Sequence, residues 1–198
     1  MFEILEAFKL AGIRVSLGFQ GDIGQTALAL NVVDAYSTGI GYRERFDHSG
    51  VMSRQRRLTG QAKPSGGPTA GVFLPLAEGT VPRRLAQALY SDESIRTRLA
   101  CDLGGCAKQI DAPVNDPRAH YLHSRASRVE EILRYPPAWR PSHERDRLRT
   151  AIEFRERLNA HQLPTYTRKF KTQEKIGTRT MNALLTQVDR RIDASKSA

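Results

Sequence analysis

Apolar positions in the first forty residues change between helical and strand spacing. Through residues 2–10 they recur every three or four positions, which predicts a helix with one apolar face. The β-branched run 13–19 then predicts a strand, residues 22–32 a second helix, and residues 32–38 another strand. A strand, a helix and a strand in this order form a βαβ unit, which requires parallel strands and a helix covering the sheet.

From residue 72 onward the apolar spacing is helical. Pro82 suits the first turn of one helix, and Ser91 with Asp92 can cap the next. Three longer helices are predicted beyond these. The first covers residues 119–134 and ends before a Pro-Pro pair. The second covers residues 142–163, with Ser142 as its cap and a proline after its end, and the third covers residues 181–192.

Residues 41–71 interrupt this pattern. Five arginines lie in the first part of the segment, and the second part is rich in glycine and proline; the arginines are Arg43, Arg45, Arg54, Arg56 and Arg57. Such a composition predicts a long exposed segment, which is either a solvated linker or a loop that contacts phosphates over a site. Both interpretations stay open at this point.

The charge of the chain indicates a partner. Lysine and arginine total 31 against 21 acidic residues, which gives a net charge of +10 and a pI near 10.1. This balance favours binding of tRNA or DNA through the phosphate backbone, although a basic protein without such a partner is the alternative. A second basic run, Arg168, Lys169 and Lys171, contains Phe170, which is suited either to stack on bases or to pack at a core edge.

Several classes of function lack support. No apolar run approaches the length of a membrane span, and the amino terminus carries no basic leader, so we expect a cytoplasmic protein without a membrane partner. The sequence contains no Walker loop, GxGxxG, HExxH or GxSxG motif. Nucleotide hydrolysis, dinucleotide redox chemistry and the common hydrolase reactions are therefore not indicated.

The two cysteines, Cys101 and Cys106, lie five positions apart around a glycine-bearing turn. Without an export signal, a metal-binding or reduced pair is favoured over a disulfide. Zinc prefers four ligands, and His143 at a predicted helix start is the best candidate for a third, with Asp102, His123 or water as the fourth. The alternative is two small buried residues and surface histidines.

Two stretches of the chain carry a family resemblance. The first is LGFQGDI at residues 17–23 followed by VDAYS at residues 33–37. The second starts with CDLGGC at residues 101–106, and the motifs after it are RAHYLH at 118–123, EIL at 131–133, His143, and RTAI at 149–152. In this order they resemble the C-terminal half of the tRNA-guanine transglycosylases, a superfamily whose relatives also place 7-deazaguanines in DNA.

The resemblance implies an α/β fold that is a remnant of a (β/α) barrel, with about two parallel strands followed by a mainly helical zinc-binding region. It divides the chain into a C-terminal part of a barrel (residues 1–45), a flexible basic linker (46–71) and a helical zinc-stapled region (72–198). It also implies zinc ligands at Cys101, Cys106 and His143. The family reaction is base exchange, in which an aspartate attacks the ribose and a 7-deazaguanine replaces guanine.

The departures from the family pattern define the expected function. Leu103 replaces the middle cysteine, and Ser37 aligns with the nucleophilic aspartate, while Asp34 would need a shifted register to take that role. A complete barrel requires roughly 250 residues. We therefore expect a nucleic-acid-binding part that does not catalyse alone and that joins a companion chain or another copy of itself. The alternative is a self-standing basic helical module that binds nucleic acid or a protein without base exchange.

Overall fold

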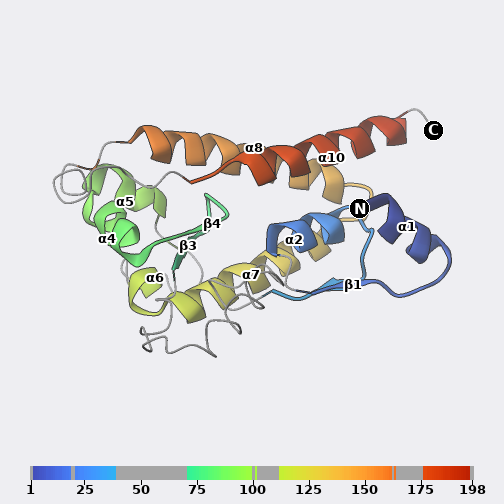
Figure 1. The fold of residues 1–198 in the computed structure, drawn as a ribbon, viewed down its shortest axis with the longest axis horizontal. Helices are drawn as coiled ribbons and strands as arrows, with labels where there is room; N and C mark the ends of the chain where they lie inside the picture. The colour runs from blue at the N-terminus through green and yellow to red at the C-terminus, as the bar shows by residue number, and fades with distance from the viewer. Residues whose placement is uncertain are drawn as a thin grey trace, which may run out of the picture.

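The computed structural model describes residues 2–18, 21–38, 71–99, 101, 112–161, 163 and 176–196. This part of the chain is a mixed and mainly helical α/β structure (Figure 1). Its elements are α1 (Phe2–Leu10), β1 (Ser16–Leu17), α2 (Gly21–Ala29), β2 (Ala35–Tyr36), β3 (Val72–Leu74), β4 (Gly79–Val81), α4 (Arg83–Ser91), α5 (Glu93–Leu99), α6 (Ala112–Asn115), α7 (Pro117–Arg134), α8 (Arg140–Ala160) and α10 (Arg179–Lys196). The predicted α/β class with a mainly helical remainder is confirmed, and the described residues form no barrel.

The βαβ unit is present. Strands β1 and β2 are parallel, with Ser16 opposite Ala35 and Leu17 opposite Tyr36, and α2 connects them. Each strand is shorter than the apolar run predicted, since only two residues of each are paired. The Ser37 N–H donates to the Leu17 carbonyl at 2.7 Å and extends the pairing by one step.

Left-handed residues end the first two helices. Gly12 has φ 77° after α1, and Asn31 has φ 56° after α2. In the second case the Asn31 N–H donates to Leu28 and the Val32 N–H to Ala27, which is the Schellman arrangement. Glycine and asparagine are the residues that adopt this backbone at least cost, so these two positions direct the chain into the strands.

The antiparallel hairpin of β3 and β4 corrects the prediction that the chain is helical from residue 72. Val72 pairs with Val81, and Leu74 pairs with Gly79. The three residues of β3 are all buried, so the strand has no exposed face and shows no polar alternation. A short apolar run of this kind has no period that separates a buried strand from a helix.

The predicted helices after the hairpin are present, with one corrected boundary. Asp116 caps α7 by accepting the Ala119 N–H at 3.1 Å, so this helix begins slightly before the predicted start. Ser142 was expected to cap α8 and does not. The backbone is already helical at Trp139, and Ser142 lies within the first turn, where Pro141 supports the start of the helix.

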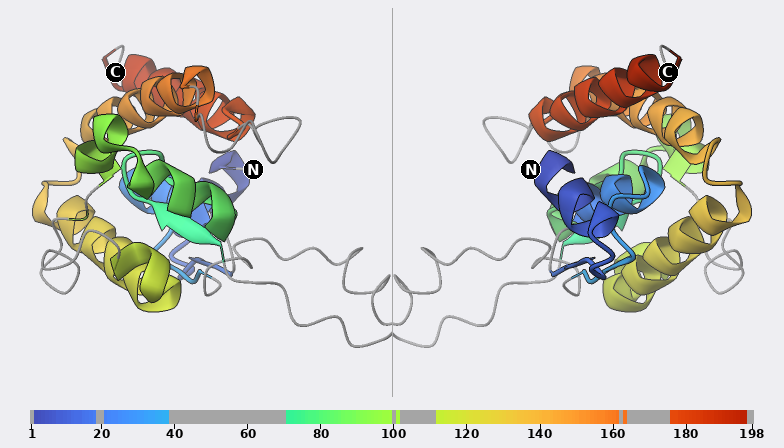
Figure 2. Two further views of the ribbon diagram at one scale, coloured as in Figure 1. Left: turned by 90° about the vertical axis from the view of Figure 1, so that its left-hand side faces the viewer. Right: turned by 90° about the vertical axis from the view of Figure 1, so that its right-hand side faces the viewer.

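The helices enclose the strands from two sides. Helices α8 and α10 lie side by side along the long axis, α7 lies on the opposite side, and α2 and the hairpin lie between them (Figures 1 and 2). Two apolar clusters result. One joins the hairpin, α4 and α5 to the C-terminal half of α8, and the other joins β1, α2 and α10 to the middle of α8. Within the described residues no helix is both long and apolar enough to span a membrane.

Candidate functional site

A buried group of charged residues lies between the two apolar clusters; we call it the arginine cluster, and its members are Glu78, Arg125, Arg128, Arg147, Asp22 and Glu144. Its centre is the carboxylate of Glu78, which is almost fully buried. This carboxylate lies 3.3 Å from Arg125 Nη1, 3.0 Å from Arg128 Nε and 3.2 Å from Arg147 Nη1. Glu78 also has φ 45° in the turn of the hairpin, a left-handed backbone conformation that is strained for a residue other than glycine. The same residue thus combines a strained backbone with a side chain held by three arginines.

Arg125 links α7 to the first turn of α2. Its Nη1 and Nη2 atoms each lie 3.0 Å from Asp22 Oδ1, and Nη1 also donates to Gln25 Oε1 at 3.2 Å. The guanidinium carbon is 4.7 Å from the centre of the Phe73 ring, which is a cation–π contact. One arginine therefore joins a helix, the βαβ unit and the hairpin.

Arg147 makes the equivalent link from α8. Its Nε and Nη2 atoms each donate to a different oxygen of Glu144 at 2.7 Å, which is a bidentate pair one turn along the same helix. The hydroxyl of Thr26 donates to Glu144 Oε1 at 2.6 Å and attaches this pair to α2. All three side chains are buried.

Charge keeps Glu78 ionised. Burial alone would raise its pKa, but the positive charges of Arg147, Arg125 and Arg128 outweigh burial and hold the pKa below its usual value. Tyr36 lies within the field of the same charges, and burial raises the pKa of its phenol. Because Glu78 is neutralised by guanidinium groups and closed to solvent, the cluster is suited to hold elements together rather than to transfer protons.

Arg155 holds the hairpin turn through backbone carbonyls instead of carboxylates. Its Nε donates to the Ala77 carbonyl at 2.6 Å, and its terminal nitrogens donate to the carbonyls of Glu78 and Gly177. The side chain is buried. Three arginines of the described part, Arg125, Arg147 and Arg155, are therefore buried, and Arg128 is half-buried beside them.

The two residues considered for the nucleophile position lie at opposite ends of the strand pair. Asp34 precedes β2, where it accepts the Val15 N–H at 2.9 Å and pairs with Lys9 at 3.1 Å. The Val15 hydrogen bond, followed by Lys9, lowers the pKa of Asp34. Ser37 follows β2 at the carboxyl end, where chemistry in parallel β/α folds is placed. Asp34 therefore has a structural role at the amino end.

The structure does not bring the predicted metal ligands Cys101 and His143 together. Cys101 is buried and follows α5, and Asp92 before α5 pairs with His161 beyond the C-terminus of α8 at 2.8 Å. His143 lies in the first turn of α8, and the 18 positions from His143 to His161 span roughly 27 Å along this helix at ~1.5 Å per residue. Figure 1 shows α5 and the α7–α8 junction at opposite ends of the long axis.

A zinc site of the predicted kind needs every ligand atom within about 2.3 Å of the metal. Cys106 lies outside the described residues. Among the residues that the structure describes, no three His, Cys, Asp or Glu side chains gather as a metal group. Zinc binding by the cysteine segment stays a prediction.

The residues predicted to contact nucleic acid also lie outside the described ranges; they are Arg43, Arg45, Arg54, Arg56, Arg57, Arg168, Lys169 and Lys171. Their role stays a prediction from the sequence.

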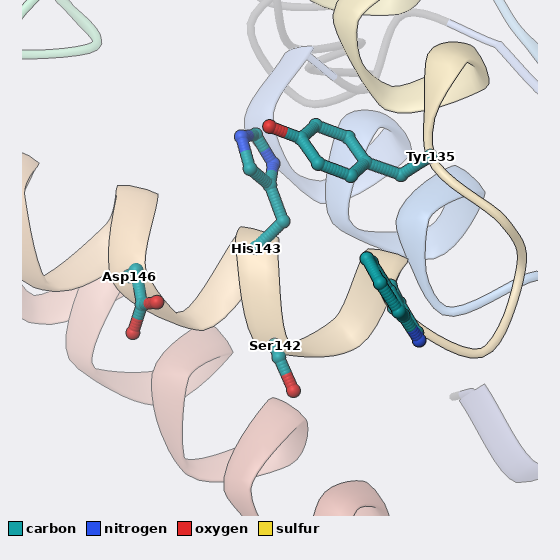
Figure 3. Close-up of a pocket in the computed structure, with 5 residues that line it drawn as sticks. Tyr135, Ser142, His143 and Asp146 are labelled. Carbon is teal, nitrogen blue, oxygen red and sulfur yellow. The ribbon is translucent and has the colours of Figure 1, made fainter.

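His143 instead lines a groove at the junction of α7 and α8 (Figure 3). Its imidazole stacks on the Tyr135 ring with centroids 4.4 Å apart, and its Nε2 atom is 3.0 Å from Glu131 Oε1. The groove has a volume of about 420 Å³, and its lining is completed by Trp139, Ser142 and Asp146. No sequence pattern predicted this groove, although the only tryptophan of the chain lies in it.

His120, in the motif RAHYLH, is a buried histidine whose neutral form is favoured by its burial. Its Nε2 atom lies 2.9 Å from the Phe73 carbonyl, and burial lowers its pKa. The unfolded chain therefore binds a proton more readily than the folded chain, so stability is complete above about pH 6.5 and falls as the pH drops below that value.

We expect the urea midpoint of the wild type to fall between pH 7 and pH 5.5, and we expect less of this fall in His120→Gln. Glutamine can donate to the same carbonyl and does not titrate. Parallel pH curves for the two proteins would contradict this role of His120.

Comparison of the chain with protein-family models, with curated proteins and with solved structures finds no match.

Proposed function

We propose that this chain binds nucleic acid, as the C-terminal part of a tRNA-guanine or 7-deazaguanine transglycosylase-like protein that does not catalyse alone. The distribution of positive charge is the observation that carries the proposal. Arg125, Arg128 and Arg147 are used inside the fold against carboxylates. Two segments of the sequence hold most of the excess: residues 39–70 have six basic and two acidic side chains, and residues 164–175 have four and one.

The ends of both segments are attached to the helical frame. Thr38, before the first segment, accepts a hydrogen bond from Tyr121 of α7 at 2.9 Å. Ile176, after the second, exchanges two hydrogen bonds with the Asn159 side chain of α8, at 2.8 and 3.0 Å. The basic segments therefore connect to fixed points on two different helices, which supports a nucleic-acid surface built on this frame.

The transglycosylase part of the proposal is supported by the motif order and by the position of Ser37 after β2. A serine in place of the family aspartate removes the carboxylate that would attack the ribose, so exchange would need another chain. Ile4, Phe8 and Leu10 of α1 and Ile13 after it are exposed apolar residues, and they are available for a companion chain or a second copy. A cytoplasmic location and zinc at the cysteine segment belong to the same proposal.

A self-standing binding module without base exchange is the second candidate. The observation that favours it is the pair of apolar clusters, each closed by elements of this chain. Exchange of labelled guanine into tRNA or DNA, measured with and without co-expressed barrel strands, separates the two candidates. Base exchange that occurs only when the barrel strands are co-expressed supports the transglycosylase hypothesis.

A direct binding measurement tests nucleic-acid binding, which both candidate functions share. Fluorescein-labelled tRNA and a duplex DNA of similar length are titrated with the intact chain at 50 mM KCl. We expect saturable binding of at least one, with a dissociation constant of about 10⁻⁵ M or tighter. Polyglutamate of similar charge is the control for attraction to any polyanion. No binding of either nucleic acid, or equal binding of polyglutamate, would contradict the proposal.

A further inference from the structure

The groove at the α7–α8 junction presents an unusual aromatic side chain. Trp139 is 66% exposed, although tryptophan is normally well buried. Its position is held by the backbone: the Trp139 N–H donates to the Pro136 carbonyl at 2.9 Å, and the His143 N–H donates to the Trp139 carbonyl at 3.1 Å. The backbone that carries this exposed ring is therefore held on a stiff Pro-Pro corner, which lowers the conformational entropy that the main chain loses when a ligand packs against the ring.

The second part of the groove is the stacked pair of Tyr135 and His143, whose planes are 30° apart. Figure 3 shows the two rings facing each other, with His143 and Asp146 projecting from α8. Glu131 fixes the imidazole, and Arg140 Nε donates to the Tyr135 carbonyl at 2.9 Å. Both rings are thus held in place by neighbours that do not line the groove.

Size and charge indicate the ligand. A volume of about 420 Å³ is in the range of small-ligand sites and accommodates one aromatic base. Asp146 and Ser142 add oxygen acceptors, which suit the amino groups of a base. Arg134 is largely exposed in the same corner and pairs with Glu130 only at 3.9 Å, so its charge is available to a phosphate.

We propose that this groove is a stacking site for an unpaired base of a single-stranded nucleic acid. The inference rests on the proposed function, and it names the face and the form of the partner. Bases inside a duplex present only their edges, whereas a base in a loop or at an end can stack on an aromatic ring. The site is independent of the basic segments in sequence, so the two contributions are separable.

The single tryptophan makes the test direct, because the intrinsic tryptophan fluorescence of the chain comes from Trp139. The intact chain is titrated with a single-stranded octanucleotide and with an abasic strand of equal length. We expect the base-bearing strand to quench the fluorescence and to bind about 5- to 150-fold more tightly than the abasic strand. Both variants lack tryptophan, so their binding is measured by the anisotropy of fluorescein-labelled strands. Trp139→Ala should lose this preference, and Trp139→Phe should keep a part of it.

Leu133→Ala is the matched control, because Leu133 is exposed near the end of α7 but does not line the groove. It should leave both affinities unchanged, and thermal melting of each variant verifies that it folds. Equal binding of the two strands by the wild type would overturn the inference while the proposed function stands. Binding of neither strand would also overturn the inference, and the titration with tRNA and duplex DNA then decides separately whether the proposed function stands. Quenching by a proline-rich peptide and not by the octanucleotide would assign the groove to a peptide and overturn the inference.

Discussion

Replacing Glu78 with alanine is expected to lower the free energy of unfolding by about 3–5 kcal/mol. The carboxylate is the shared partner of Arg125, Arg128 and Arg147. Its removal leaves guanidinium charges close together in a region without solvent, where uncompensated charge costs most. Urea denaturation at pH 7 measures the loss as a lower midpoint at an unchanged slope.

Two further variants separate charge from shape. Glu78→Gln keeps the size of the side chain and removes its charge, so we expect a loss nearly as large as that of alanine. Glu130→Ala removes an exposed partner of Arg134 at 3.9 Å and should change stability by no more than about 0.5 kcal/mol. A loss below about 1 kcal/mol in Glu78→Ala would show that the arginine cluster does not hold the fold together.

Neutralising Arg54, Arg56 and Arg57 together is expected to weaken nucleic-acid binding by about 10- to 500-fold near 0.1 M salt. Each phosphate contact releases counterions and contributes up to about 0.9 logarithmic unit per tenfold change in salt, so three lost contacts contribute up to about 2.7. Fluorescence anisotropy with labelled tRNA or DNA measures the change, and the fold should be unaffected.

The control removes the same charge elsewhere. Arg83, Arg98 and Arg190 are exposed on α4, α5 and α10, and their triple replacement by alanine lowers the net charge equally. We expect at most a fewfold change in affinity for this variant. Equal losses in the two triple variants would mean that overall charge, rather than the basic segment, determines binding.

The local parts of this fold are readable from the sequence. Period and turn residues predict the βαβ unit, and Gly12 after α1 and Asn31 after α2 adopt the left-handed backbone that commonly ends helices. The hairpin is missed because Val72–Leu74 is buried on both faces and carries no alternation. Periodicity alone does not distinguish a buried strand from a helix in so short an apolar run.

The arginine cluster was not predictable in the same way. Thr26 and Glu144 are 118 positions apart, and Arg125 and Glu78 are 47 apart, so no spacing rule connects them. His143 shows the opposite case: its place before a helix suggested a metal ligand, but α8 directs it toward Tyr135 and away from Cys101. The order of motifs along the chain can suggest candidate functional residues. It does not indicate which of those residues lie in contact in the folded chain.

The salt dependence of binding tests the central claim, that the positive charge left over after folding serves a phosphate backbone. The association constant of the intact chain for its preferred nucleic acid is measured between 50 and 300 mM KCl. With about six phosphate contacts, the account predicts that its logarithm falls against the logarithm of salt with a slope of about −4 to −5. A slope near zero would contradict it.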